Sequence, residues 1–293
     1  MRFALTLIAA FVIVAVGLFA SGRVGALDLA NALSSGGGIA VERDIAYGDL
    51  PRQRYDLYTP AGLAADAPLV IFFYGGGWTD GSKNEYEFAA NTLAKHGYLV
   101  ALPDYRLYPE VTFPDFAFDA GKAVASIAHE HSEGRPVFLM GHSAGAHIAA
   151  LVMTDPRFLD AAGAKICDFA SGFVGLAGPY DFDLKREPYI SVFPPPLRPQ
   201  EQPVQHANGA FPPALLFHGT ADTVVKPPEA EIFAAALRAS GNRAEARYLE
   251  GVDHYTILAS LVVPFRWSIP IVEETAAFIE GERAKGYPGC KRV

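Results

Sequence analysis

The chain has 293 residues, of which 51% are hydrophobic and 19% charged, and its formal net charge is −8. This composition excludes a disordered chain, and the lack of a Lys/Arg cluster argues against a nucleic-acid-binding protein. Two isolated cysteines, Cys167 and Cys290, exclude a disulfide scaffold and fit neither a zinc nor a redox CxxC site. The length allows one large α/β domain or two small ones.

The N-terminus carries an uncharged apolar run, residues 3–20, which follows Arg2. Small residues at 24–26 occupy the positions that a signal peptidase reads, so residues 1–26 are expected to be a cleaved signal peptide. An uncleaved membrane anchor through residues 3–20 is the alternative, whereas a buried core helix would need a polar face that the run lacks. Both leading interpretations predict an exported protein, periplasmic or secreted. An oxidising compartment would permit a disulfide between the two cysteines, whose separation in space the sequence does not give.

From residue 39 onward, short apolar runs alternate with longer helical patterns. The runs predict strands at 39–41, 54–58, 69–73, 98–102, 137–140, 173–177, 214–217 and 244–249. The helical patterns lie at 83–96, 116–131, 144–153, 229–239 and 271–280. Such alternation is typical of βαβ units, so we expect one domain over 39–283 with a mostly parallel eight-stranded sheet and helices on both faces.

A Pro-rich segment, residues 180–213, interrupts this alternation. Strands and helices resume after it in the same style, which indicates an insertion within one domain and not a linker between two. Inserted loops at the carboxyl edge of a parallel sheet often cover a binding site.

The G-H-S-A-G sequence at residues 141–145 fits G-x-S-x-G, and it lies between a predicted strand and a predicted helix. A sharp strand-to-helix turn needs glycine on both sides and presents the Ser143 hydroxyl above the sheet edge. The start of the following helix adds positive potential for an oxyanion. Ser143 is therefore the candidate nucleophile.

The sequence Tyr74 to Trp78 contains three consecutive glycines directly after the predicted strand at 69–73. Acyl transfer needs N–H donors where charge grows on the carbonyl oxygen, and a glycine loop supplies them. We assign this role to the amides of Gly76, Gly77 and Ala144. A phosphate loop is disfavoured because the lysine of GxxxxGK[ST] and the full GxGxxG pattern are absent.

A serine nucleophile needs a base and an orienting carboxylate, in the chain order Ser, acid, His. His254 follows the last predicted strand and is the candidate base, and Asp222 follows the preceding strand and is the candidate acid. Asp253 is the rival acid, but neighbouring side chains rarely face each other in a loop. The other histidines after Ser143 are assigned to packing, surface and loop-supporting roles: His147, His206 and His218.

These motifs resemble those of α/β-hydrolases of the esterase/lipase type, over residues 40–282. The glycine loop, the segment 104–110 and G-x-S-A-G are similar to the hormone-sensitive-lipase-like carboxylesterases. The sequences at 76–78, 178–181 and 218–225 resemble kynurenine formamidase-like enzymes. One departure is Tyr74, where members of the family usually have histidine, and altered loop packing is expected there.

The resemblance implies a serine hydrolase of carboxylic esters. The small insertion and the lack of a long apolar lid predict short-chain acyl or aryl esters as substrates, and the expected mechanism requires no metal and no other cofactor. Arylformamidase or amidase activity, or a non-catalytic exported binding module, are the alternatives. A small-molecule ester or amide is the expected partner, and the oligomeric state stays open. The residues expected to line the pocket are Tyr74, Trp78, His142, Tyr180 and Tyr255.

Overall fold

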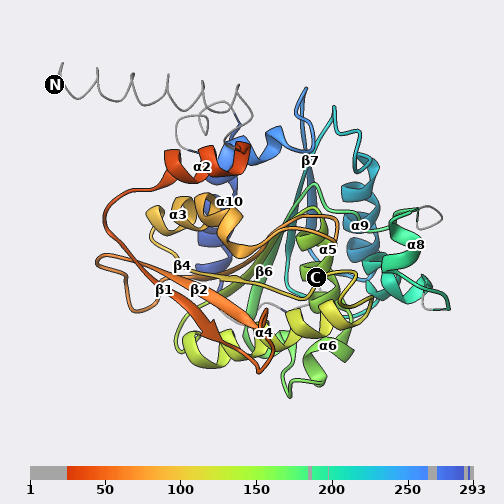
Figure 1. The fold of residues 1–293 in the computed structure, drawn as a ribbon, viewed down its shortest axis with the longest axis horizontal. Coiled ribbons are helices and arrows are strands. Elements are labelled where there is room, and N and C mark those ends of the chain that lie inside the picture. Colours follow the sequence, from red (N-terminus) through yellow and green to blue (C-terminus); the bar gives the residue numbers. More distant parts are fainter. Residues whose placement is uncertain (1–24, 184–186, 197, 263–268, 287–289, 291–293) are drawn as a thin grey trace.

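The computed structural model describes residues 25–183, 187–196, 198–262, 269–286 and 290. Its centre is an eight-stranded sheet with the order β1-β2-β4-β3-β5-β6-β7-β8 (Figure 1). β2 pairs antiparallel with both β1 and β4, and the other neighbouring strands run parallel, which confirms the predicted sheet. The strands are β1 (Ile39–Ala46), β2 (Arg54–Pro60), β3 (Leu69–Phe73), β4 (Leu99–Pro103), β5 (Val137–His142), β6 (Ala170–Leu176), β7 (Ala214–Gly219) and β8 (Ala244–Leu249).

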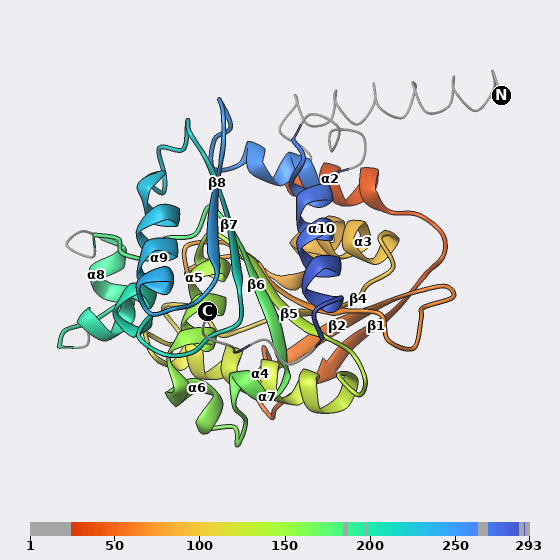
Figure 2. The same ribbon diagram turned by 180° about the vertical axis from the view of Figure 1, so that it is seen from behind.

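Helices cover both faces of the sheet (Figures 1 and 2). The helices α3 (Glu87–Lys95) and α10 (Ile271–Arg283) pack on one face. The other face carries α4 (Asp115–His131), α5 (Ala144–Thr154) and α9 (Pro228–Ala239). Shorter elements are α2 (Ala26–Ser34), η1 (Lys83–Tyr86), α6 (Pro156–Asp160), α7 (Ile166–Phe169), α8 (Tyr189–Val192), η2 (Arg198–Glu201), η3 (Pro203–His206) and η4 (Thr256–Leu261).

The central strands β3, β5, β6 and β7 are buried along their whole length. Parallel strands that are covered on both faces need continuous apolar runs. Such runs predicted these strands in the sequence. The edge strand β8 is largely exposed, with only its first and last residues buried. The layered core therefore fixes the carboxyl ends of the central strands, from which the site is built.

Helix α2 was not expected, because the folded domain was predicted to begin at residue 39. It packs on α3, so the folded domain includes residues before 39 (Figure 1). The predicted signal peptide or anchor falls almost entirely on residues 1–24, which lie outside the described residues. Within the described ranges, no helix combines the length and the apolar character that crossing a bilayer requires.

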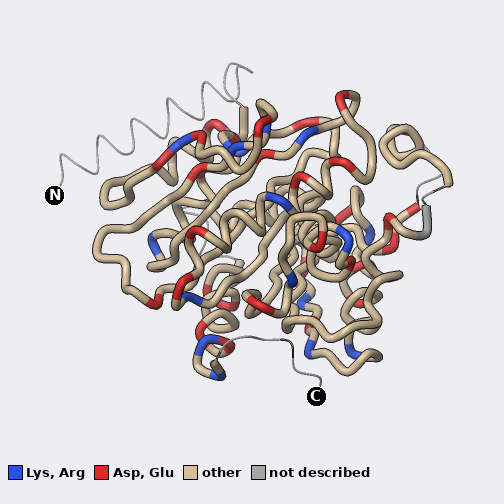
Figure 3. The backbone as a smooth tube through the Cα atoms, turned by 90° about the horizontal axis from the view of Figure 1, so that it is seen from below, with Lys and Arg blue, Asp and Glu red and all other residues tan. Residues whose placement is uncertain are grey.

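Charged residues of the two signs are interspersed over the described part of the chain (Figure 3). Arg106, for example, binds Asp119 at 2.7 Å, and Lys83 binds the buried Asp56 at 2.7 Å. This agrees with the sequence, in which basic residues do not cluster.

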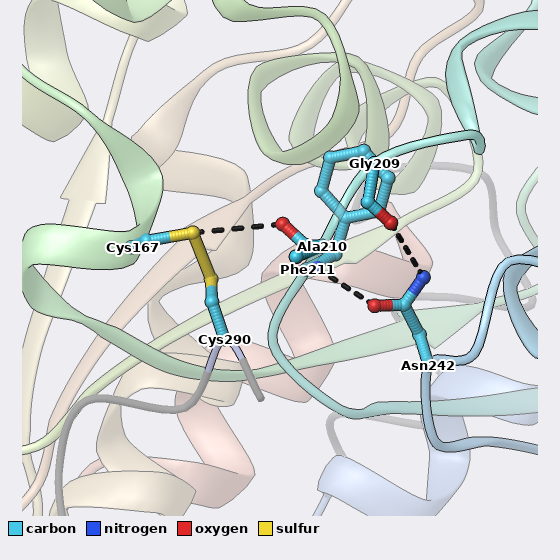
Figure 4. The surroundings of a disulfide bond; sticks show 6 residues. All are labelled: Cys167, Gly209, Ala210, Phe211, Asn242 and Cys290. Carbon is cyan, nitrogen blue, oxygen red and sulfur yellow. Dashed lines mark hydrogen bonds between the residues drawn. A yellow bond between two sulfur atoms is a disulfide. The ribbon is translucent and has the colours of Figure 1, made fainter. Parts of the chain in front are cut away.

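The two cysteines are joined in the structure by a disulfide between Cys167 and Cys290, with a Cα–Cα distance of 5.3 Å. The bond links α7 to a residue near the C-terminus across 123 positions of sequence (Figure 4). The nearby carbonyl oxygen of Ala210 lies 3.5 Å from Cys167 Sγ.

Candidate active site

Ser143 occupies the turn between β5 and α5, with φ 53° and ψ −124°. This left-handed region is strained for a residue with a side chain, and such strain is common where a turn presents a functional group. The turn needs glycine at 145, because a Cβ there would lie 2.2 Å from the Phe73 carbonyl oxygen. The backbone thus holds the Ser143 hydroxyl at the carboxyl edge of the sheet.

His254 and Asp222 meet Ser143 from the loops after β8 and β7. His254 Nε2 lies 2.9 Å from Ser143 Oγ, and His254 Nδ1 lies 2.8 Å from Asp222 Oδ2. All of these side chains are buried. Because a carboxylate only accepts, Nδ1 carries the proton and Nε2 accepts from the serine hydroxyl. The structure therefore brings together the three residues that the motifs singled out.

The loops that carry Asp222 and His254 are hydrogen-bonded to each other. The amide of Ala221 donates to the Val252 carbonyl at 3.0 Å, and that of Gly251 donates to Thr220 Oγ1 at 2.9 Å. Parallel pairing of β7 with β8 brings both loops to one edge of the sheet. This backbone pairing sets the distance between the carboxylate and the imidazole.

Asp222 is held in its charged form by hydrogen bonds. Its Oδ1 accepts from the amides of Val224 and Val225, each at 2.9 Å. Burial opposes ionisation, but the hydrogen bonds from His218, His254 and Val225 outweigh it and hold the pKa of Asp222 well below its usual range. The carboxylate is therefore charged at neutral pH and able to stabilise an imidazolium.

The rival acid, Asp253, does not touch the imidazole of His254. Its Oδ1 accepts from the amides of Tyr255 and Thr256, at 2.9 and 2.8 Å, and so closes the turn that precedes η4. His218 supports the other loop, since its Nε2 lies 3.0 Å from the Val225 carbonyl and 3.3 Å from Asp222 Oδ2.

The remaining histidines lie where packing or surface roles were expected. His147 is buried in α5, where its Nε2 donates to the Glu201 carbonyl at 2.7 Å. Burial lowers its pKa to about 3. His206 bonds the Gln200 carbonyl at 2.9 Å. Neither side chain lines the cavity that contains Ser143.

The glycine loop runs directly over the nucleophile. A Cβ on Gly75 would lie 3.1 Å from Ser143 Cβ, and one on Gly76 would lie 2.0 Å from the Asp80 carbonyl oxygen. Gly76 and Gly77 also have positive φ, 134° and 61°. Among the described residues, the amides of Gly76 and Gly77 donate to no backbone carbonyl. Ala144 is the first residue of α5, whose N-terminal amides lack partners within the helix.

His142 links the backbone of the base to η1, a contact that the sequence did not suggest. Its Nε2 donates to the carbonyl of His254 at 3.1 Å, and its Nδ1 accepts from the Tyr86 hydroxyl at 3.0 Å. Burial, together with the neighbouring His254 ring, lowers the pKa of His142 to about 3, so it is neutral at working pH. Tyr86 comes from η1, 56 residues before His142, and no motif in the sequence marks it.

Ser143 and His254 lie in a cavity of about 1220 Å³. The Pro-rich insertion contributes Phe182 and Tyr189 to its wall, as expected for a segment that covers a site. Trp78 also lines the cavity, and its ring stacks on Phe182 with centroids 5.3 Å apart. His142 and the exposed Tyr255 complete the predicted lining residues that the structure places there.

Tyr74 and Tyr180 were expected in the pocket, but neither lines the cavity. Tyr74 is fully buried, stacks on Tyr105 and accepts a 2.7 Å hydrogen bond from Arg52 through its hydroxyl. Tyr180 stacks on Phe233 of α9 with centroids 4.7 Å apart. Both rings are buried and fill space in the core beneath the loops, so they point away from the cavity.

Among the described residues, no cluster of three or more His, Cys, Asp or Glu side chains is arranged to bind a metal ion. His131, the last residue of α4, instead contacts β2, with its Nε2 2.8 Å from the Tyr55 hydroxyl.

Comparisons with known proteins show similarities in sequence and in fold. A family model described as BD-FAE matches residues 55–171. Isoprenylcysteine alpha-carbonyl methylesterase of Arabidopsis thaliana is 33% identical over 240 residues, covering 73% of this chain and 56% of that protein. Kynurenine formamidase of Danio rerio is 28% identical over 230 residues, covering 75% of this chain and 76% of that protein.

Among solved structures, esterase B of Lactobacillus rhamnosis has the same fold, with a TM-score of 0.75 at 20% identity, over 94% of this chain and 96% of that one. The strand order, the turn at Ser143 and these similarities define the protein as an α/β-hydrolase. Within that superfamily it belongs to the esterase/lipase type, as the motifs implied. The chain spans about half the length of the plant methylesterases that it matches.

Proposed function

We propose that the protein hydrolyses carboxylic esters, with Ser143 as nucleophile, His254 as base and Asp222 as orienting acid. The observation that carries this proposal is the continuous hydrogen-bonded chain from Ser143 Oγ through His254 to Asp222, inside a cavity. The whole arrangement depends on backbone geometry that costs strain at Ser143, and such strain persists where it serves a function.

In the acylation step, Ser143 Oγ forms a bond to the ester carbonyl carbon while its proton moves to His254 Nε2. The carbonyl oxygen becomes an oxyanion, which the amides of Gly76, Gly77 and Ala144 stabilise. One such donor is typically worth about 3 kcal/mol of transition-state stabilisation. The tetrahedral intermediate then expels the alkoxide, which takes the proton from His254 and leaves as the alcohol.

Deacylation repeats these steps with water. His254 takes a proton from the water as its oxygen attacks the acyl-enzyme, and returns it to Ser143 Oγ when the acid leaves. The charged Asp222 stabilises the imidazolium in both steps.

Relatives support both an ester and a formamide substrate. The plant relative is named a methylesterase, and the zebrafish relative, of whose length this chain covers 76%, is named a formamidase. Both reactions use the same attack on a carbonyl carbon, so arylformamide hydrolysis is the second candidate. Within esters, the small insertion and the aromatic wall of Trp78 and Phe182 favour short acyl groups or aryl esters.

A panel of p-nitrophenyl esters, anilides and N-formyl aromatic amines, assayed side by side, tests this proposal. We expect kcat/KM to be highest for the esters with acyl chains of two to about four carbons, and to fall for longer chains because the aromatic wall limits the acyl side. Ser143→Ala removes this turnover, whereas Ser132→Ala, at the end of α4, retains it.

A rate that climbs steadily toward long acyl chains would contradict the short-acyl preference. Turnover of N-formyl aromatics at 100 times the ester rate would make the formamidase assignment correct. No turnover of any member of the panel, in well-folded protein, would favour a non-catalytic binding role.

The export of the protein is also part of the proposal. The apolar run at residues 3–20 suits a signal peptide or an anchor, and the Cys167–Cys290 disulfide suits an oxidising compartment. Intact-mass analysis of the protein from fractionated cells is expected to find an oxidised chain outside the cytoplasm. A fully reduced cytoplasmic chain that keeps residues 1–26 would contradict export.

A further inference from the structure

Helix α2 forms an apolar wall of the cavity that contains Ser143 and His254. The residues of α2 that line the cavity are Ala26, Leu27, Leu29, Ala30 and Leu33. Their spacing of i, i+1, i+3, i+4 and i+7 places them on one face of the helix. Leu27, Leu29 and Leu33 are only half-buried, so the cavity leaves part of this leucine face uncovered.

Polar contacts hold α2 in place beside the cavity. Asn31 Nδ2 donates to the Asn84 carbonyl at 2.8 Å, and Asn31 Oδ1 accepts from the Phe88 amide at 2.8 Å. Lys95 Nζ donates to the Ser34 carbonyl at 2.6 Å. A helix of nine residues is marginal on its own, so these bonds to η1 and α3 are what position its leucines.

Another part of the cavity wall comes from the segment that follows His254. Leu258, Ala259 and Val262, in and just after η4, line the same cavity, as does Phe88 at the start of α3. The exposed Tyr255 stands beside the His254 ring, with centroids 5.4 Å apart. The polar lining residues next to this wall are Glu85, Tyr86 and Thr256.

We propose that α2 and η4 form a binding subsite for a bulky apolar group on the alcohol side of the ester, which rests on the function proposed above. His254 must protonate the departing alkoxide, so the alcohol part of the substrate lies beside His254. The chain continues from His254 through Tyr255 into η4, and residues of both η4 and α2 line the cavity. The substrate class is therefore an ester of a short acid with a large apolar alcohol.

Two matched ester series test this subsite on the full chain. One series is ethyl, butyl, hexyl and octyl acetate, and the other is p-nitrophenyl acetate, butyrate, hexanoate and octanoate. Burying each methylene in an apolar site is expected to raise kcat/KM about two- to fourfold. For the wild type, kcat/KM should therefore rise along the alkyl acetates and not along the acyl series.

The test variant is Leu29→Gln, and its matched control is Ala32→Gln, an exposed position of the same helix that does not line the cavity. Leu29→Gln is expected to lower the ratio of octyl to ethyl acetate kcat/KM at least fivefold, and Ala32→Gln to leave it at the wild-type value. In η4, Ala259→Leu adds bulk to the cavity lining, narrows the subsite and should lower the same ratio.

The subsite is refuted if Leu29→Gln and Ala259→Leu keep the wild-type ratio, if all acetates lose activity equally, or if only the acyl series responds. A wild-type enzyme that turns over acetates at rates independent of alkyl length refutes this inference alone. A wild-type protein that hydrolyses neither series, and whose Ser143 resists a fluorophosphonate, refutes the proposed function as well.

Discussion

Replacing Asp222 with asparagine is expected to lower kcat about 10⁴-fold with little loss of folded protein. Asp222 Oδ2 accepts a 2.8 Å hydrogen bond from the protonated Nδ1 of His254, and its Oδ1 accepts hydrogen bonds from the amides of Val224 and Val225. Asparagine can still accept from these amides, but its NH₂ group then faces His254. The imidazole would turn to the tautomer that cannot take the proton from Ser143. Steady-state kinetics with p-nitrophenyl acetate measures the loss, and circular dichroism checks the fold.

The neighbouring Asp253→Asn is the matched control. Its carboxylate caps the turn before η4 and does not reach the imidazole, so kcat should change by less than about threefold. A large loss in Asp253→Asn with activity retained in Asp222→Asn would show that the acid is misassigned.

The largest effect is expected for His254→Ala, which removes the imidazole whose Nε2 lies 2.9 Å from Ser143 Oγ. Loss of the base in serine hydrolases of this kind costs on the order of 10⁶ in kcat, because the neutral hydroxyl is a poor nucleophile. His206→Ala, a histidine outside the cavity, should remain within about threefold of the wild type. Retention of more than about one percent of activity in His254→Ala would remove His254 from the mechanism.

Much of the fold was predictable because the central strands are buried on both faces. A continuous apolar run also fits a buried helix such as α5, but runs such as Leu69–Phe73 are too short for a helix and are rich in β-branched and aromatic residues, which identifies them as strands. The turn at Ser143 was predictable for a similar reason, because a steric requirement for glycine is visible in the sequence. The choice of Asp222 over Asp253 followed from strand order, and the contacts of the two side chains agree with it.

Contacts between distant segments were not predictable from one sequence. Helix α2 depends on Asn31, whose partners lie 53 and 57 residues away. The hydrogen bond from His142 to the His254 carbonyl spans 112 residues. The sequence does not distinguish a tyrosine that lines the pocket from one that packs in the core. The stacking of Tyr74 on Tyr105 and of Tyr180 on Phe233 shows that these two point into the core. Patterns within a short stretch of sequence do not indicate which distant residues will be in contact.

Covalent labelling by a fluorophosphonate tests the central assignment most directly, because it needs an activated serine and no knowledge of the natural substrate. Peptide mass mapping should find one adduct per chain on the peptide that contains Ser143, with labelling lost in Ser143→Ala and slowed at least 10³-fold in His254→Ala. An adduct on another serine, or equal labelling rates with and without the imidazole, would mean that this hydrogen-bonded chain is not the catalytic centre.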